Sequence, residues 1–202
     1  MTALDEVLKI AEMYLPTEIF SHRDEECEVA RKHLIALDLL LMPDNPLEPP
    51  LWLREKYRWG PVQHPMFWCQ LIRARELDCG AFSAVVREIY QARGVVALPV
   101  QAILEYPPHV IQHWKVMWRK KGISINWIWG KYVYHEIVGV ISKDKIKIYD
   151  PVENVWINPL GYVERGRIVA LRIIGGPSHL YWENRYIIPN RWYIFDNYRN
   201  KQ

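Results

Sequence analysis

The sequence predicts an α+β fold in which helices pack on an antiparallel β-sheet. Two kinds of pattern lead to this prediction. Apolar residues recur at helical spacing near the start of the chain and again after Asp78. Apolar and polar residues instead alternate, as in strands, on both sides of a polar turn near residue 143. A chain of 202 residues can form a core of this kind as one domain.

The composition restricts the class of protein. Half of the residues are hydrophobic, which argues against disorder, and a net charge of +3 gives no argument for nucleic acid as a partner. Three cysteines cannot form a disulfide framework and suit a reducing compartment. No apolar run approaches the ~20 residues of a membrane span, and the first residues are unlike a secretory signal. We therefore expect a cytoplasmic protein that does not bind a membrane.

Residues 1–42 are predicted to form a helical cap over the core. A first helix is expected over residues 3–15, because its apolar residues fall on one face before Pro16. A second helix is expected to begin at Ser21 or Asp24 and to run to about residue 42, with acidic residues in its first turn.

Residues 43–70 are predicted to be a connection rich in proline and aromatic residues. Six prolines between positions 43 and 65 are expected to prevent regular structure. Aromatic and cationic residues are interleaved here: Trp52, Arg54, Lys56, Tyr57, Arg58 and Trp59. This mixture fits either a loop that faces a substrate or a connection whose aromatic side chains pack under the cap.

The catalytic core is placed at residues 71–174, and its central element is a helix that begins at Cys79. Asp78 is a favourable N-cap residue, and Arg93 and Gly94 are typical of a helix end. The apolar residues between them have the spacing of one helical face: Phe82, Val85, Val86 and Ile89.

Cys79 is the candidate nucleophile. At the helix start its thiol would lie near unpaired N–H groups and the positive end of the helix dipole, and both favour the nucleophilic thiolate. Gly80 would leave the space beside the sulfur open for a substrate. The alternative is that Cys79 is a small buried core residue.

A β-hairpin is predicted over residues 132–150. Its arms alternate on each side of a polar turn from Ser142 to Lys145, and Asp150 ends the second arm. Antiparallel pairing around this turn would bring His135 close to Asp150. The two residues could therefore be neighbours despite their separation in sequence.

The segment between the helix and the hairpin is expected to consist of strands. Residues 95–104 form the first, residues 106–109 a loop, and residues 113–118 and 123–129 two further strands. His109 and His113 are alternative bases by residue type, but no carboxylate lies ahead of either in a paired strand. His135 is therefore preferred.

Cysteine, histidine and aspartate in these settings form a nucleophile, a base and a group that orients the base. The motifs Asp78-Cys79-Gly80, Tyr134-His135-Glu136 and Tyr149-Asp150-Pro151 resemble the transglutaminase-like branch of the papain-like cysteine enzymes. The resemblance covers about residues 70–160. It implies a papain-like core and a thioester acyl-enzyme formed, without a cofactor, from an amide or thioester of a peptide, protein or carrier-bound acyl substrate. Arylamine N-acetyltransferases share the arrangement, so the acceptor, water or an amine, stays open.

The oxyanion partner is also open. Papain-like enzymes often use an upstream glutamine, for which Gln70 is the nearest candidate, and the backbone N–H of Cys79 is the other donor. Trp68, two residues before Gln70, is a further weak candidate for the oxyanion or substrate site. Gln101 is either a second polar group near the site or an edge residue.

Two other functions are compatible with the sequence. By ligand type, Cys79, His135 and Asp150 could bind zinc, although a fourth ligand is missing. A fold that has lost turnover could instead serve as a binding or scaffold protein, since ten Trp and twelve Tyr could line a recognition surface. The aromatic tail, residues 175–202, either packs over the sheet or binds a partner.

Overall fold

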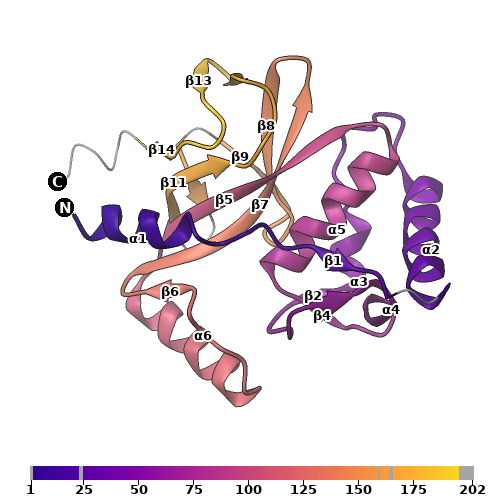
Figure 1. The fold of residues 1–202 in the computed structure, drawn as a ribbon, viewed down its shortest axis with the longest axis horizontal. Helices are drawn as coiled ribbons and strands as arrows, with labels where there is room; N and C mark the ends of the chain where they lie inside the picture. Colours follow the sequence, from indigo (N-terminus) through magenta and orange to yellow (C-terminus); the bar gives the residue numbers. More distant parts are fainter. Residues whose placement is uncertain (1, 23–24, 159, 164–165, 196–202) are drawn as a thin grey trace.

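A ten-stranded, mostly antiparallel sheet organises the fold, and helices cover part of it (Figure 1). The computed structural model describes residues 2–22, 25–158, 160–163 and 166–195. This arrangement confirms the predicted α+β class. No helix among these residues is both long and apolar enough to cross a membrane.

The two longest strands form the centre of the sheet. β5 (Val96–Glu105) and β7 (Tyr132–Ser142) pair antiparallel along their length, from Val96 opposite Ile141 to Glu105 opposite Tyr132. β11 (Gly166–Ile173) pairs with the other side of β5, and β8 (Lys145–Asp150) pairs with β7. β7 is rich in buried β-branched residues, which suit a pleated surface covered on both faces.

Shorter strands extend this centre in the order β10-β11-β5-β7-β8-β12-β13, with β14 beside β11, β6 beside β7 and β9 beside β8. Among the described residues, the β12–β8 pair is the only parallel one in this sheet. Two small parallel pairs, β1–β3 and β2–β4, lie outside it. The bounds of the short strands are β1 Ile19–Phe20, β2 Arg58–Trp59, β3 Met66–Phe67, β4 Glu76–Leu77, β6 Ile128–Trp129, β9 Val155–Ile157, β10 Tyr162–Val163, β12 Leu180–Trp182, β13 Arg185–Ile187 and β14 Tyr193–Ile194.

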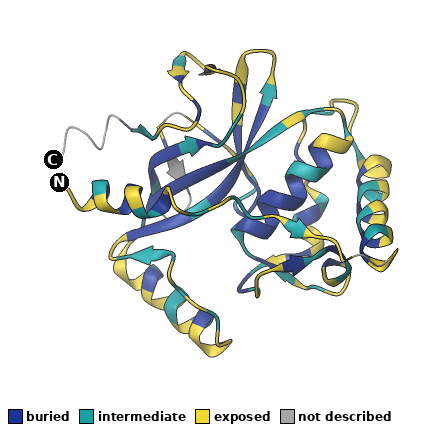
Figure 2. Ribbon diagram, viewed as in Figure 1, coloured by how far each residue is buried: buried dark blue, intermediate teal, exposed yellow. Residues whose placement is uncertain are grey.

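The helix α5 (Cys79–Ala92) packs against β5 and β7, as predicted. The Asp78 side chain caps it by accepting a hydrogen bond from the Ala81 N–H at 2.9 Å. Gly94 follows its last turn with a φ of +74°, a conformation that glycine adopts without strain. Its buried face includes Phe82, Val85, Val86 and Ile89, and Figure 2 shows the helix dark blue beside the sheet.

The two N-terminal helices do not form the single cap predicted over residues 1–42. α1 (Ala3–Ala11) packs on the sheet near Ile103 and Tyr132. α2 (Glu25–Leu41) packs instead against α5 and the short helix α4 (Trp68–Leu71), on the other side of the molecule (Figure 1). In the described part of the chain between these helices, Ile19 and Phe20 form β1. Asp24, one predicted start of the second helix, lies outside the described residues.

The proline-rich connection contains regular structure that was not predicted. α3 (Trp52–Lys56) and β2 both fall within it. Pro49 and Pro50 precede the helix rather than interrupt it, and there their missing N–H groups break no helical hydrogen bond.

The segment after β5 also differs from prediction. α6 (Pro108–Lys120) replaces the loop and strand expected over residues 106–118, and only β6 is strand within residues 123–129. Tryptophan and valine favour strands, but Val110, Trp114 and Trp118 recur at the four-residue spacing of a helical face. Figure 1 shows α6 projecting from the main body.

The described part of the aromatic tail packs over the sheet. β12 and β13 extend the β8 side, β14 pairs with β11, and the side chains of Trp182 and Phe195 are each 2% exposed. The burial of these large rings supports the packing interpretation, whereas Tyr181 and Tyr186 are exposed. Tyr198, the last aromatic residue of the tail, lies outside the described residues.

Candidate functional site

Cys79, His135 and Asp150 meet where the start of α5 approaches the sheet. Nε2 of His135 lies 2.9 Å from Oδ2 of Asp150, and the Cys79 thiol lies close enough to the His135 imidazole for each to change the pKa of the other. The register of β7 and β8 explains the first contact. Its last pair is Val138 with Tyr149, so the next residue of β8 lies beside the part of β7 that carries His135. The predicted hairpin is confirmed.

The Asp150 carboxylate is fixed by its own turn. Oδ1 accepts hydrogen bonds from the backbone N–H groups of Val152 at 2.8 Å and Glu153 at 3.2 Å. The residue is fully buried, so Oδ2 is held in place for the imidazole. Because Nε2 of His135 faces this carboxylate, Nδ1 is the ring nitrogen left for the thiol.

The pKa of His135 is raised well above its ordinary value. Burial alone would lower it, but the charge and hydrogen bond of Asp150, helped by Cys79, outweigh the burial. The Asp150 carboxylate therefore makes the imidazole beside the thiol a stronger base.

The pKa of the Cys79 thiol is raised, mainly by burial. The hydrogen bond and charge of His135 lower it, whereas Asp78 and Glu136 add to the increase. The sequence had led us to expect a thiolate favoured by the helix start. The thiol does lie at the first position of α5, but burial opposes the ionisation that the helix start favours.

Gly80 does not keep a space open for a substrate. A Cβ at this position would overlap the Thr17 hydroxyl and would lie 2.8 Å from the Thr17 Cβ. The N-terminal segment therefore passes directly over the start of α5. We call residues 14–17 of this segment the strap.

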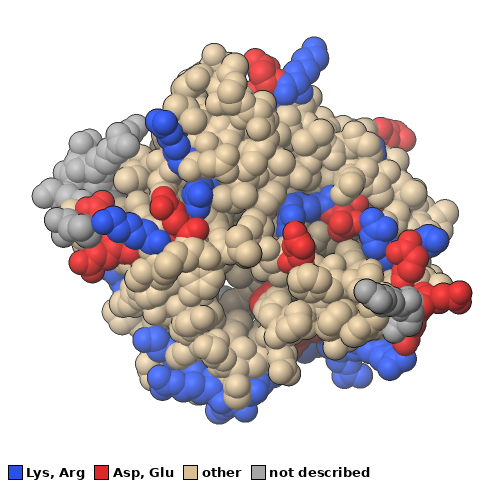
Figure 3. Space-filling view, in the orientation of Figure 1, with Lys and Arg blue, Asp and Glu red and all other residues tan. Residues whose placement is uncertain are grey.

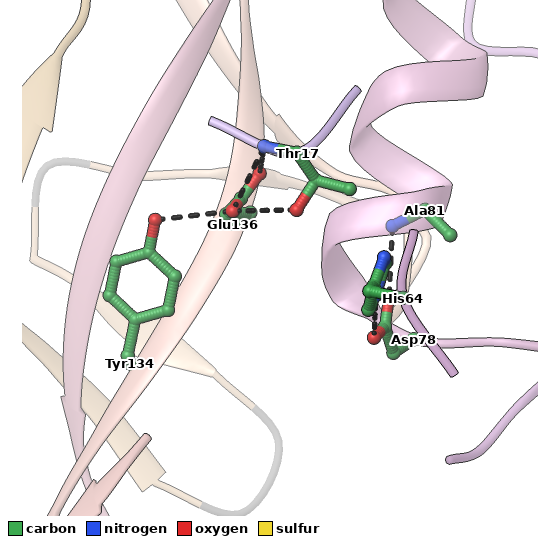
Figure 4. Close-up of polar contacts among 6 residues, drawn as sticks. All are labelled: Thr17, His64, Asp78, Ala81, Tyr134 and Glu136. Atoms are coloured by element: carbon green, nitrogen blue, oxygen red, sulfur yellow. Dashed lines mark hydrogen bonds and ion pairs between the residues drawn. The ribbon is translucent and has the colours of Figure 1, made fainter. Parts of the chain in front are cut away.

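The strap is hydrogen-bonded to a buried carboxylate on β7. Glu136 accepts hydrogen bonds from the Thr17 N–H at 3.0 Å, the Thr17 hydroxyl at 2.9 Å and the Tyr134 hydroxyl at 3.2 Å (Figure 4). The Glu136 pKa is raised by burial, and the bonds from Thr17 and the charge of Arg87 oppose that increase. Tyr14 strengthens the attachment by stacking on Tyr134, with 5.0 Å between ring centroids.

A second imidazole–carboxylate pair lies at the start of α5. Nε2 of His64 is 2.7 Å from Oδ2 of Asp78, whose other oxygen accepts the Ala81 N–H (Figure 4). The pKa of His64 is raised by its hydrogen bond to Asp78. Sequence reasoning missed this pair, because His64 belongs to the proline-rich connection and no motif marks it.

Cys79 and His135 open into a cavity of about 370 Å³. The strap, the α3–β2 segment and α6 all contribute to its walls. Figure 3 shows a hollow on this face, between α6 and the start of α5. Its aromatic wall consists of Trp59, Tyr106, Trp114, Trp118 and Trp127.

The three weaker candidates from the sequence do not line this cavity. Trp68 is buried in the core, and Oε1 of Gln70 accepts the Phe67 N–H at 3.0 Å, so this side chain is held by its own short helix. Gln101 is not an edge residue, because β5 is paired on both sides. It is fully buried, and its Nε2 donates to the Tyr14 carbonyl at 2.8 Å.

The alternative bases and the zinc hypothesis find no support in the arrangement. His109 and His113 are exposed on α6 and do not line the cavity. Within the described ranges, no group of three or more His, Cys, Asp or Glu side chains could hold a metal ion.

Comparisons of the chain with protein-family models, with curated proteins and with solved structures found no match. When a thiol lies beside an imidazole and the imidazole lies beside a carboxylate, the thiol can act as a nucleophile. The imidazole takes its proton, and the carboxylate stabilises the resulting imidazolium.

Proposed function

We propose that this protein is a cysteine-dependent acyl-transfer enzyme with a transglutaminase-like, papain-like core. The observation that carries the proposal is the His135 imidazole, which lies 2.9 Å from the buried Asp150 carboxylate and beside the Cys79 thiol. A residue that only filled the core would not require this arrangement. The cavity in front of the thiol supports the same function.

The reaction would proceed in two halves. The Cys79 sulfur transfers its proton to His135 and attacks the carbonyl carbon of an amide or thioester. His135 then gives that proton to the leaving amine or thiol, which leaves a thioester on Cys79. In the second half, His135 takes a proton from water or an amine, which attacks the thioester and releases the sulfur.

Two further groups have defined roles in this scheme. Asp150 orients His135 and stabilises its protonated form. The Cys79 N–H lies in the first turn of α5, where helix geometry provides no carbonyl partner, and it is the donor best placed for the oxyanion. The acyl donor belongs to peptides, proteins or carrier-bound acyl groups, and either water or an amine can serve as acceptor.

The test is acylation by an activated ester. After incubation with p-nitrophenyl acetate, intact-mass measurement should find one acetyl group, and peptide mapping should place it on Cys79. Cys79→Ala should abolish the adduct. His135→Ala should slow its formation and raise the pKa of iodoacetamide labelling at Cys79, because the imidazole lowers the thiol pKa. Cys69→Ala, which removes a half-buried thiol away from the cavity, is the matched control.

A binding protein with the same fold is the second candidate, and the raised pKa of Cys79 favours it. A neutral thiol is a poor nucleophile, and the aromatic cavity could hold a ligand without reacting with it. Cys79 that stays unlabelled until the protein unfolds would select this function over catalysis.

A further inference from the structure

One wall of the cavity carries a cation that lacks a counterion. The Arg54 side chain, from α3, lines the cavity, and its Nη1 is buried without a hydrogen-bond partner. Its guanidinium lies over the ring of Phe82, 5.5 Å from the centroid. Arg93 and Arg167 are paired with Asp38 and Glu105. Arg87, whose Nε also lacks a partner, lies outside the cavity lining and donates through Nη2 to the Thr17 carbonyl. No ion pair joins Arg54 to a carboxylate among the described residues.

The acidic residues that line the cavity already interact with groups other than Arg54. Asp78 is paired with His64, and Glu136 accepts hydrogen bonds from Thr17 and Tyr134. Glu153 also has contacts of its own. The charge on Arg54 is therefore left for a molecule that enters the cavity.

A second N–H group on the same segment supports this inference. Nε1 of Trp59 is buried without a partner, and Trp59 also lines the cavity. A buried donor without an acceptor destabilises a folded protein, and here two such donors lie beside one cavity. Oxygen atoms of a bound ligand would accept from both.

The surroundings would strengthen binding of an anion. The tryptophans of α6 and the following loop make this side of the cavity apolar: Trp114, Trp118 and Trp127. Interactions between charges are stronger where water is displaced by such side chains. Guanidinium groups also match the planar geometry of a carboxylate with two parallel hydrogen bonds.

We propose that the acyl donor carries a carboxylate group, which Arg54 binds with help from Trp59 while the reacting carbonyl lies at Cys79. This inference rests on the proposed function and names the class of its substrate. It predicts that Cys79 reacts faster with acidic electrophiles than with neutral ones of the same shape.

The experiment uses alkylating probes of graded length. Iodoacetyl-glycine, iodoacetyl-β-alanine and iodoacetyl-γ-aminobutyrate are each compared with the corresponding primary amide. Labelling of Cys79 in the full chain is followed by mass spectrometry, and each rate is divided by the rate of the same probe with glutathione. The series samples several distances between the thiol and the guanidinium.

At the matching length, the carboxylate probe should label the wild-type protein roughly tenfold faster than its amide, the ratio that one charge-assisted hydrogen bond supplies. Arg54→Gln should reduce this ratio to near one. Trp59→Phe, which keeps the ring and removes its N–H, should reduce it partly. Arg58→Gln is the matched control, because this arginine is exposed on the same segment and does not line the cavity.

Two results would overturn the inference, and they are distinguishable. If the amide probes label Cys79 but the wild-type ratio is near one at every length, the carboxylate proposal is wrong and the acyl-transfer proposal stands. If no probe labels Cys79 in the folded protein, both proposals are wrong. The wild-type ratio decides the first case even if Arg54→Gln fails to fold.

Discussion

Replacing Asp150 should separate two contributions to the stability of the site. In Asp150→Ala, His135 loses its charged partner, and the N–H groups of Val152 and Glu153 lose their acceptor. Removing one member of a buried ion pair typically destabilises a protein by about 3–5 kcal/mol, and we expect a loss in this range.

Asp150→Asn should be milder. The amide keeps an oxygen in the position of Oδ1, so the two N–H groups retain their acceptor, and only the charged hydrogen bond to His135 is lost. Such a bond contributes about 1.5–3 kcal/mol. The difference in unfolding free energy between the two variants therefore measures how much the hydrogen bonds of the Val152 and Glu153 N–H groups stabilise the protein.

Urea unfolding followed by tryptophan fluorescence provides the assay, since the chain has ten tryptophans. The free energies of unfolding of the wild type and both variants are compared at one pH. If the alanine variant lost less than about 1 kcal/mol, the His135–Asp150 pair would not stabilise the protein as a buried ion pair. Equal losses for alanine and asparagine would instead refute the role assigned to the turn.

Three other predictions concern pH and packing. The stability gap between the wild type and the asparagine variant should be larger at pH 6 than at pH 9. Because the folded-state pKa of His135 is raised, its contribution to the free energy of unfolding is complete below the ordinary pKa of about 6.5. That contribution is lost as the pH rises through the raised pKa. Equal gaps in urea titrations at both pH values would contradict this. Gly80→Ala should destabilise by about 1–3 kcal/mol, and Thr17→Gly should remove most of that loss in a double-mutant cycle, whereas additive losses would show that the two residues do not touch. Arg93→Met should destabilise by about 3–5 kcal/mol in thermal or urea unfolding, because it leaves the buried Asp38 carboxylate without its bidentate partner; a near-neutral result would show that Asp38 finds another partner.

The elements predicted correctly from the sequence are those whose signals are local. The helix at Cys79 has its cap, apolar face and terminal glycine within a short segment, and the hairpin arms flank their own turn. α6 was mistaken for a strand because its tryptophans and valines favour strands, whereas its packing depends on Trp59 and Trp127, which lie elsewhere in the chain.

In the site, too, the contacts with local sequence signals could be predicted and the others could not. Cys79, His135 and Asp150 could be brought together from the helix start and the hairpin register alone. Thr17 and Glu136 could not, because they are 119 positions apart and no periodic pattern relates them. Gln70 was chosen by its position along the chain, but a single turn of helix directs its side chain to its own backbone.

The close approach of Thr17 to Gly80 has a consequence for how this sequence can vary. The two positions share one small volume beside the nucleophile, so a larger residue at one requires a smaller residue at the other. Among natural relatives of this chain, positions 17 and 80 should therefore covary. A chain with alanine at position 80 should have glycine at position 17 or follow a different path over the helix start.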